Sequence, residues 1–163
     1  MHERFKYRTK DDLIHKAGEL CLDLPWSDDI TPLFQSFQLP EFSVANRFVV
    51  QPMEGYDSEN DGSPSDLSKR RYLRYASGGS GMIWFEAVSV MSEGRSNPHQ
   101  LWIHKKNSDS FSRLNAEVRK NALKTGTDPF LVVQLTHSGR YSKPEGKAKP
   151  QVAALNPLLD KTP

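Results

Sequence analysis

Three largely apolar segments limit the possible folds of this chain more than any other feature. They cover residues 46–53, 81–90 and 128–136. Apolar runs without regular polar alternation are typical of parallel strands, which are covered on both faces. Helical patterns separate the three runs, so the predicted order is strand, helix, strand, helix, strand. Right-handed crossovers would then place all three strand C-termini at one end of a parallel sheet.

The two intervening helices have recognisable ends. The first is predicted to start at Ser63 and the proline that follows it, whose missing N–H costs nothing in a first turn, and to stop at Gly78. The second carries an apolar stripe. It is expected to be capped by Ser108 or Asp109 and to end near Gly126.

The segment before the first strand predicts two small elements. Residues 9–24 have the pattern of a short amphipathic helix capped by Thr9. Residues 30–44 are interrupted by prolines and alternate loosely, which is typical of a small hairpin or lid. We therefore expect an N-terminal helical extension over residues 1–29. Residues 30–163 would form a separate domain.

Composition argues against several classes of function. The chain has 22 basic and 20 acidic residues, a net charge of +2, which disfavours nucleic acid or a membrane surface as a partner. Cys21 is the only cysteine, so neither an intramolecular disulfide nor a CxxC site is possible. His99 and His104 lack the spacing of helical ligands, and we expect no metal. No apolar stretch has the length of a signal-peptide core or a membrane span, so a cytoplasmic setting is expected.

Polar side chains accompany the end of each apolar run. Glu54 and Tyr56 come after the first run, Glu86 lies in the second, and Gln134 and His137 close the third. A strand needs none of these groups at its end for stability. If the strands are parallel, these side chains gather at one end of the sheet. In a (β/α) barrel that is the end at which chemistry takes place.

The residues around the three runs resemble a known family. The segments NRFVVQPMEGYDSENDG, RYASGGSGMIWFEAVSVMSEGR and VVQLTHSGRYSKP are similar, in order and spacing, to the first three strand regions of the old yellow enzyme family. Its members are FMN-dependent NAD(P)H:flavin oxidoreductases built on a TIM barrel. The resemblance implies an α/β fold, an incomplete (β/α)8 barrel. It would hold the first three βα units, preceded by the N-terminal helix and the hairpin lid.

The resemblance also implies which residues bind FMN. It places Gln134 at the pyrimidine edge of the flavin, where one carboxamide offers both an acceptor and donors. The backbone around Pro52 and Met53 would pass close to the ring, and Ala87 would lie against it as a small residue. Plainer alternatives stay open, namely backbone satisfaction by Gln134 at a strand end and ordinary packing of Ala87. The resemblance places His137 in a turn that shapes the floor and rim of the flavin site; alternatively, the histidine donates to backbone in a tight turn.

Two further positions lie near the expected reaction centre. The resemblance places Tyr56 on the substrate side, although an exposed loop tyrosine explains it equally well. It places Glu54 beside the redox-active nitrogen of the flavin, where the family usually has a small residue. A carboxylate there would repel the anionic reduced ring by roughly 4 kcal/mol at an effective dielectric of 20 and about 4 Å. We therefore expect Glu54 to be protonated, hydrogen-bonded or turned away, and to lower the flavin potential or change the substrate.

The chain is short for such a barrel. A complete barrel has eight units over about 250 residues or more, whereas this chain holds three. The family's substrate-anchoring His/Asn pair on the fourth strand, its arginine on the fifth and its phosphate-binding loops after strands seven and eight are absent from it. The resemblance therefore implies that residues 30–163 are the N-terminal part of an FMN-binding barrel of a longer enzyme, with weak FMN binding and little activity alone.

The implied function is that of an ene-reductase. NADH or NADPH would reduce FMN, which would pass a hydride to an activated C=C bond of a small molecule; an oligomer is possible. One alternative is a non-catalytic half-barrel that serves as a scaffold or partner-binding module. Another is a phosphate-binding barrel enzyme such as an aldolase, for which no lysine lies inside the apolar part of any run. Both alternatives predict a colourless protein, whereas bound flavin is yellow.

Overall fold

The structure is a computed structural model and describes residues 4–159. By its internal contacts the chain splits into two compact units, Met1–Thr31 and Pro32–Pro163. None of the helices in the described range is long and apolar enough to cross a membrane. The elements follow in the order α1 (Lys10–Glu19), the 3-10 helix η1 (Thr31–Leu33), β1 (Phe37–Leu39), β2 (Phe42–Val44), β3 (Val49–Val50), α2 (Asp66–Ser77), β4 (Met82–Ser89), η2 (Ser92–Gly94), α3 (Ser108–Leu123), β5 (Phe130–Thr136) and η3 (Gly139–Tyr141).

Helix α1 lies in the first unit. It begins in a capping box in which the Thr9 hydroxyl accepts a backbone N–H of the first turn, at 3.1 Å. The helix ends at Glu19, so the predicted extension to residue 24 is wrong. The chain leaves it through a Schellman turn: Cys21 adopts a left-handed φ of 54°, and the N–H of Leu22 donates to a carbonyl of the last turn at 2.8 Å. The prediction of residues 1–29 as a separate extension stays a proposal.

Strands β1 and β2 pair antiparallel and confirm the hairpin predicted within residues 30–44. The ring of Phe42 packs against that of Phe130, with 4.9 Å between centroids. Phe130 is the first residue of β5. The hairpin lid therefore lies at the N-terminal end of the sheet, the end opposite to the predicted site residues.

Strands β3, β4 and β5 form one parallel sheet in that order, which confirms the predicted parallel arrangement. The first strand is much shorter than the predicted run 46–53, since only two of its residues pair with β4. At its start the Asn46 side chain replaces backbone pairing, accepting the Gly81 N–H at 2.7 Å and donating to the Gly79 carbonyl at 2.8 Å. At its end Pro52 has no N–H with which to extend the ladder.

Helices α2 and α3 begin at residues other than the predicted caps. Helix α2 is capped by Ser65, whose hydroxyl accepts two backbone N–H groups of the first turn at 3.2 Å each, so the predicted start at Ser63 is wrong. Helix α3 follows Asn107, whose side chain makes no capping bond, so neither Ser108 nor Asp109 caps it. The Asn107 carboxamide bonds the preceding turn instead.

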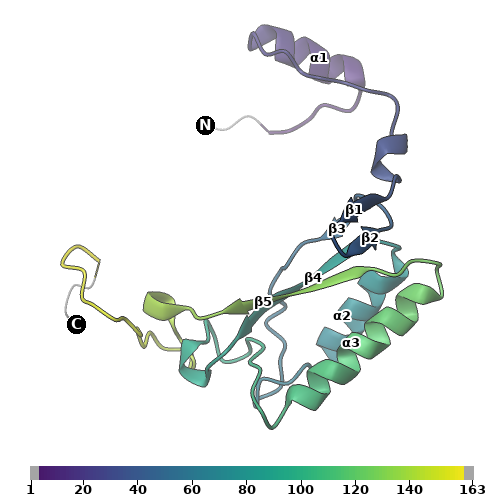
Figure 1. The fold of residues 1–163 in the computed structure, drawn as a ribbon. Coiled ribbons are helices and arrows are strands. Elements are labelled where there is room, and N and C mark those ends of the chain that lie inside the picture. Colours follow the sequence, from purple (N-terminus) through teal and green to yellow (C-terminus); the bar gives the residue numbers. More distant parts are fainter. Residues whose placement is uncertain (1–3, 160–163) are drawn as a thin grey trace. The chain divides into compact units, whose positions relative to one another are not determined.

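The two helices lie side by side against one face of the sheet (Figure 1). The stacked rings of Tyr72 and Phe85, 4.3 Å apart between centroids, join α2 to β4. The buried core between helices and sheet consists of Tyr72, Ala76, Ile83, Phe85, Leu114, Val118 and Ala122. In the described part of the second unit both helices are on this face, so the expected cover on both faces is wrong for this chain. Helices on one side only are what a barrel requires, because all of its helices lie outside.

Candidate functional site

A bulge in β4 determines to which face of the sheet the side chains near the strand end point. The ladder pairs Phe85 and Ala87 with consecutive residues of β5, the second of which is Gln134, and leaves Glu86 without a partner. An extra residue of this kind shifts the side to which the following side chains point. Phe85 and Val88 consequently both line a small cavity between the sheet and α3. Ala87, by contrast, lies next to Gln134 in register.

Gln134 lies on the face of β5 turned away from the helices. Leu131 and Val133 of the same strand line the cavity against α3. Because successive strand residues alternate between faces, Gln134, which follows Val133, points to the opposite face. The side chain is half-buried, and no residue in the described range hydrogen-bonds its carboxamide. The alternative in which Gln134 satisfies backbone groups therefore has no support in these contacts. Its predicted contact with a flavin stays a prediction.

Gln100, a residue for which the sequence raised no hypothesis, joins the strand ends. Its side chain is only 1% exposed. Its amide nitrogen lies within hydrogen-bonding distance of the Ala87 carbonyl (3.2 Å) and the Thr136 hydroxyl (3.3 Å), and its Oε1 accepts the Ser96 N–H at 2.6 Å. One carboxamide thus ties β4, β5 and the loop after β4 together. A glutamine in a long polar loop carries no sign of burial, so the sequence alone gave no reason to select it.

Glu54 is held by donors from the loop after β4. One carboxylate oxygen accepts from the Ser96 hydroxyl (3.1 Å) and the Asn97 carboxamide (3.2 Å). The other lies 3.4 Å from the Gln100 amide nitrogen, a longer and weaker contact. Of the three arrangements expected for Glu54, the structure shows the hydrogen-bonded one.

The other predicted residues of the first strand region lie on the loop after β3. Pro52 is half-buried, whereas Met53 is 71% exposed and its N–H closes a tight turn onto the Gln51 carbonyl at 2.9 Å. Tyr56 is 59% exposed, with its ring 6.1 Å from that of His99 and its backbone in the left-handed region at φ 57°. Its predicted place on the substrate side stays a prediction.

Glu86 turns toward α2 from the bulge and is buried. Its carboxylate accepts from the Gly55 N–H (2.8 Å), the Tyr72 hydroxyl (3.1 Å) and the Arg71 guanidinium. Burial raises the pKa of Glu86, although the Gly55 N–H and the positive charge of Arg71 act in the opposite direction. Burial also raises the pKa of Tyr72, which keeps its hydroxyl protonated. Glu86 thus reaches the loop after β3, as expected for a residue at the strand ends, but from the helix side of the sheet.

His137 lies in a tight turn after β5. Its Nδ1 accepts the Gly139 N–H at 3.0 Å, so the ring takes part in a tight turn as an acceptor and not as the expected donor. Gly94 packs directly on the ring, because a Cβ there would lie 2.6 Å from it, and its carbonyl accepts the Ser138 N–H at 2.7 Å. The glycine therefore allows the loops after β4 and β5 to meet.

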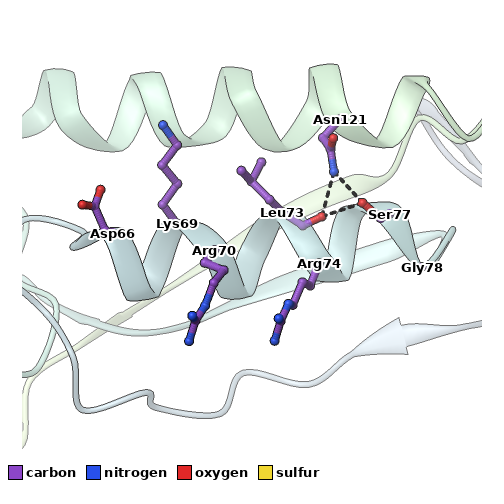
Figure 2. Close-up of a pocket in the computed structure, with 8 residues that line it drawn as sticks. All are labelled: Asp66, Lys69, Arg70, Leu73, Arg74, Ser77, Gly78 and Asn121. Carbon is purple, nitrogen blue, oxygen red and sulfur yellow. Dashed lines mark hydrogen bonds between the residues drawn. The ribbon is translucent and has the colours of Figure 1, made fainter.

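A groove of about 550 Å³ lies elsewhere, on the helix layer (Figure 2). It is lined by Asp66, Lys69, Arg70, Leu73, Arg74, Ser77, Gly78 and Asn121. Asn121 of α3 donates there to the Leu73 carbonyl (2.8 Å) and the Ser77 hydroxyl (2.6 Å) of α2. The groove contains none of the predicted site residues, so the candidate site is assigned to the strand ends. Across the described residues, no group of three or more His, Cys, Asp or Glu side chains is placed to hold a metal ion.

A parallel sheet with outer helices, and with polar loops meeting at the strand ends, defines the class of (β/α)-barrel enzymes. Residues 32–161 match the sequence model of the NADH:flavin oxidoreductase / NADH oxidase family. The chain therefore belongs to this family, the flavin-dependent oxidoreductases of the old yellow enzyme type.

Relatives in the family include two bacterial enzymes named NADPH dehydrogenase. The chain is 33% identical over 122 residues to that of Clostridium acetobutylicum, which covers 74% of this chain and 34% of the relative. It is 31% identical over 116 residues to that of Bacillus subtilis, covering 70% and 32%. The chain thus spans about a third of the length of these curated relatives.

Solved structures share the fold. Morphinone reductase superposes with a TM-score of 0.54 at 25% identity, over 68% of this chain and 27% of that one. The old yellow enzyme homologue from Zymomonas mobilis gives 0.57 at 20% identity, over 77% and 40%. These neighbours are old yellow enzyme TIM barrels, which confirms the predicted incomplete barrel.

Proposed function

We propose that this chain forms the part of an FMN site contributed by the first three strands of an ene-reductase barrel. When bound, FMN supplies the redox chemistry: it takes a hydride from NADH or NADPH and gives it to an electron-poor C=C bond. The residues of this chain bind and orient the ring. Family membership supports the cofactor, and the substrate class follows from the resemblance to the old yellow enzymes.

One observation carries the proposal, the placement of the Gln134 carboxamide. The pyrimidine edge of a flavin offers an N–H between two carbonyls, and a carboxamide has both a matching acceptor and matching donors. Gln134 is near the C-terminal end of β5, on the face without helices, and its amide bonds no described residue. Ala87, beside it in register, carries only a methyl group, the small side chain that close approach of a flat ring requires.

Glu54 and Tyr56 would act from the loop after β3. The Glu54 carboxylate accepts hydrogen bonds from Ser96 and Asn97, which restrict its position, while the residue is exposed to solvent. A fixed negative charge beside a flavin opposes charge on the reduced ring. Tyr56, exposed on the same loop, would contact the substrate. In this proposal Glu54 sets the potential and Tyr56 faces the alkene.

The complete reading frame that encodes this chain is the material for the test. We expect a yellow protein that releases FMN on denaturation. It should also oxidise NADPH or NADH in the presence of an activated alkene such as 2-cyclohexenone. A colourless protein that takes up no added FMN would contradict the proposal.

A second candidate function is a non-catalytic scaffold that binds a partner through its sheet. Strands β3 and β5 are edge strands in the described sheet, and edge strands offer unpaired backbone groups. This candidate predicts a flavin-free protein that forms a stable complex with another chain or with itself. The oligomeric state and the cytoplasmic setting stay predictions.

A further inference from the structure

Arg71, Asp57 and Glu86 form a largely buried cluster that the proposed chemistry does not use. The side chains are 20%, 13% and 1% exposed, respectively. Arg71 donates to both oxygens of Asp57, at 2.6 and 3.2 Å, and also to Glu86, while the Ser68 hydroxyl donates to Asp57 at 2.7 Å. Burial by itself lowers the pKa of Arg71, but the hydrogen bond to Asp57 and the charges of the two acids outweigh it and raise that pKa. The guanidinium is therefore a permanent charge between two carboxyl groups.

This cluster holds the loop after β3 on both sides of Tyr56. On one side the Gly55 N–H donates to Glu86 at 2.8 Å, and on the other side the Arg71 guanidinium donates to the Asp57 carboxylate. Tyr56 itself has a left-handed φ of 57°, which residues with a Cβ rarely adopt. The bonds made by its two neighbours keep its backbone in this conformation.

Gly55 fits the cluster through its size as well as its N–H. A Cβ at this position would lie 1.6 Å from a terminal nitrogen of Arg71, so the guanidinium occupies the space of a side chain. The sequence Glu54-Gly55-Tyr56 thus places two predicted site residues on either side of a glycine that is fixed to α2 and β4.

We propose that Arg71 and Glu86 are positioning residues, which fix the backbone of residues 53–57 and thereby set where Glu54 and Tyr56 stand at the site. The inference rests on the proposed function for the role of those two side chains. The fixing of the loop itself needs no flavin, so it is testable separately.

Hydrogen–deuterium exchange of the product of the complete reading frame provides the test. The variants are Arg71→Met and Glu86→Gln. Lys69→Met is the matched control, since Lys69 lies on the same helix and pairs with Glu117 of α3 at 2.8 Å, away from the loop. We expect exchange in peptides covering residues 53–57 to rise at least tenfold in both variants, with no change in the control or in the peptides of α3. Loop exchange equal to that of the wild type in both variants overturns the proposal.

Arg71→Lys is a milder variant for the case in which the first two variants do not fold and exchange rapidly throughout the chain. Lysine retains the charge but has no planar fork to bind two carboxylates. Loop exchange between three- and tenfold above wild type, with α3 protected, supports the proposal, whereas wild-type exchange contradicts it. In enzyme that contains flavin, Arg71→Lys is also expected to raise KM for the alkene more than it lowers kcat. A wild-type protein without flavin would refute the proposed function, while the exchange result would still decide the positioning role.

Discussion

Glu54 is the residue at which this chain departs most from the pattern it resembles. Where the old yellow enzyme pattern has a small residue, this chain carries a carboxylate that Ser96 and Asn97 bind. An unbound glutamate would turn toward water and act weakly on its surroundings. The two hydrogen bonds restrict the Glu54 carboxyl group to one position, so a redox group bound beside it would meet it at a fixed distance.

Replacing Glu54 by glutamine should raise the flavin midpoint potential. Glutamine keeps the shape and an acceptor oxygen but removes the charge that opposes the reduced ring. We expect a shift on the order of 30 mV, which corresponds to about tenfold in the two-electron equilibrium. Potentiometric titration of the flavoprotein measures it, with Glu59→Gln as control for an exposed carboxylate further along the same loop. Equal potentials in all three proteins would remove Glu54 from the account.

At the scale of elements, the contact between α2 and the bulge of β4 does more than bury apolar surface. The Tyr72 ring stacks on Phe85, and its hydroxyl accepts the Glu86 N–H at 2.8 Å while it donates to the Glu86 carboxylate. Because of the bulge, the Glu86 N–H has no partner in the strand ladder, and the Tyr72 hydroxyl of α2 accepts it instead. A titratable group inside such a contact links the packing of α2 to pH.

The stability of the fold is therefore expected to depend on the titration of Glu86. Its folded-state pKa is raised above the ordinary value of 4.5, so the folded chain binds this proton more tightly than the unfolded chain. The resulting stabilisation is fully present below about pH 4.5 and is lost as pH rises through the folded-state pKa. Urea unfolding from about pH 4.5 to about pH 8 should show the free energy of unfolding of the wild type falling relative to that of Glu86→Gln. Parallel pH curves for the two proteins would contradict this.

The order and direction of the elements were predictable because periodicity and apolar runs are local properties of the sequence. The boundaries of the elements were less predictable. At the start of β3, for example, the Asn46 side chain makes the hydrogen bonds to Gly79 and Gly81 that strand backbone would otherwise make. Likewise, Ser65 caps the start of α2 although Ser63 is an equally good capping residue by type. Cys21 takes the left-handed turn after α1, a position for which the sequence offers no glycine. Burial of Gln100 depends on three segments meeting in space, which no local pattern encodes.

At the scale of the whole molecule, the candidate site is shared among segments far apart in the sequence. The loop after β3, the bulge of β4 and the end of β5 each contribute one part, and the parallel sheet brings them to one end. The family resemblance supplied the roles predicted for Gln134 and Ala87, and the structure shows that the two residues are adjacent in the sheet. The chain spans about a third of the length of its curated relatives, and its affinity for a flavin is therefore a proposal.

The affinity of the complete protein for FMN, with and without the Gln134 carboxamide, is the most direct test of the account. Gln134→Leu should raise the Kd for FMN at least tenfold, the effect of losing about 1.4 kcal/mol of hydrogen bonding. Gln38→Leu, on the exposed hairpin strand at the other end of the sheet, should leave the Kd unchanged. A Kd for Gln134→Leu equal to that of the wild type would contradict the assignment of the strand ends as a flavin site.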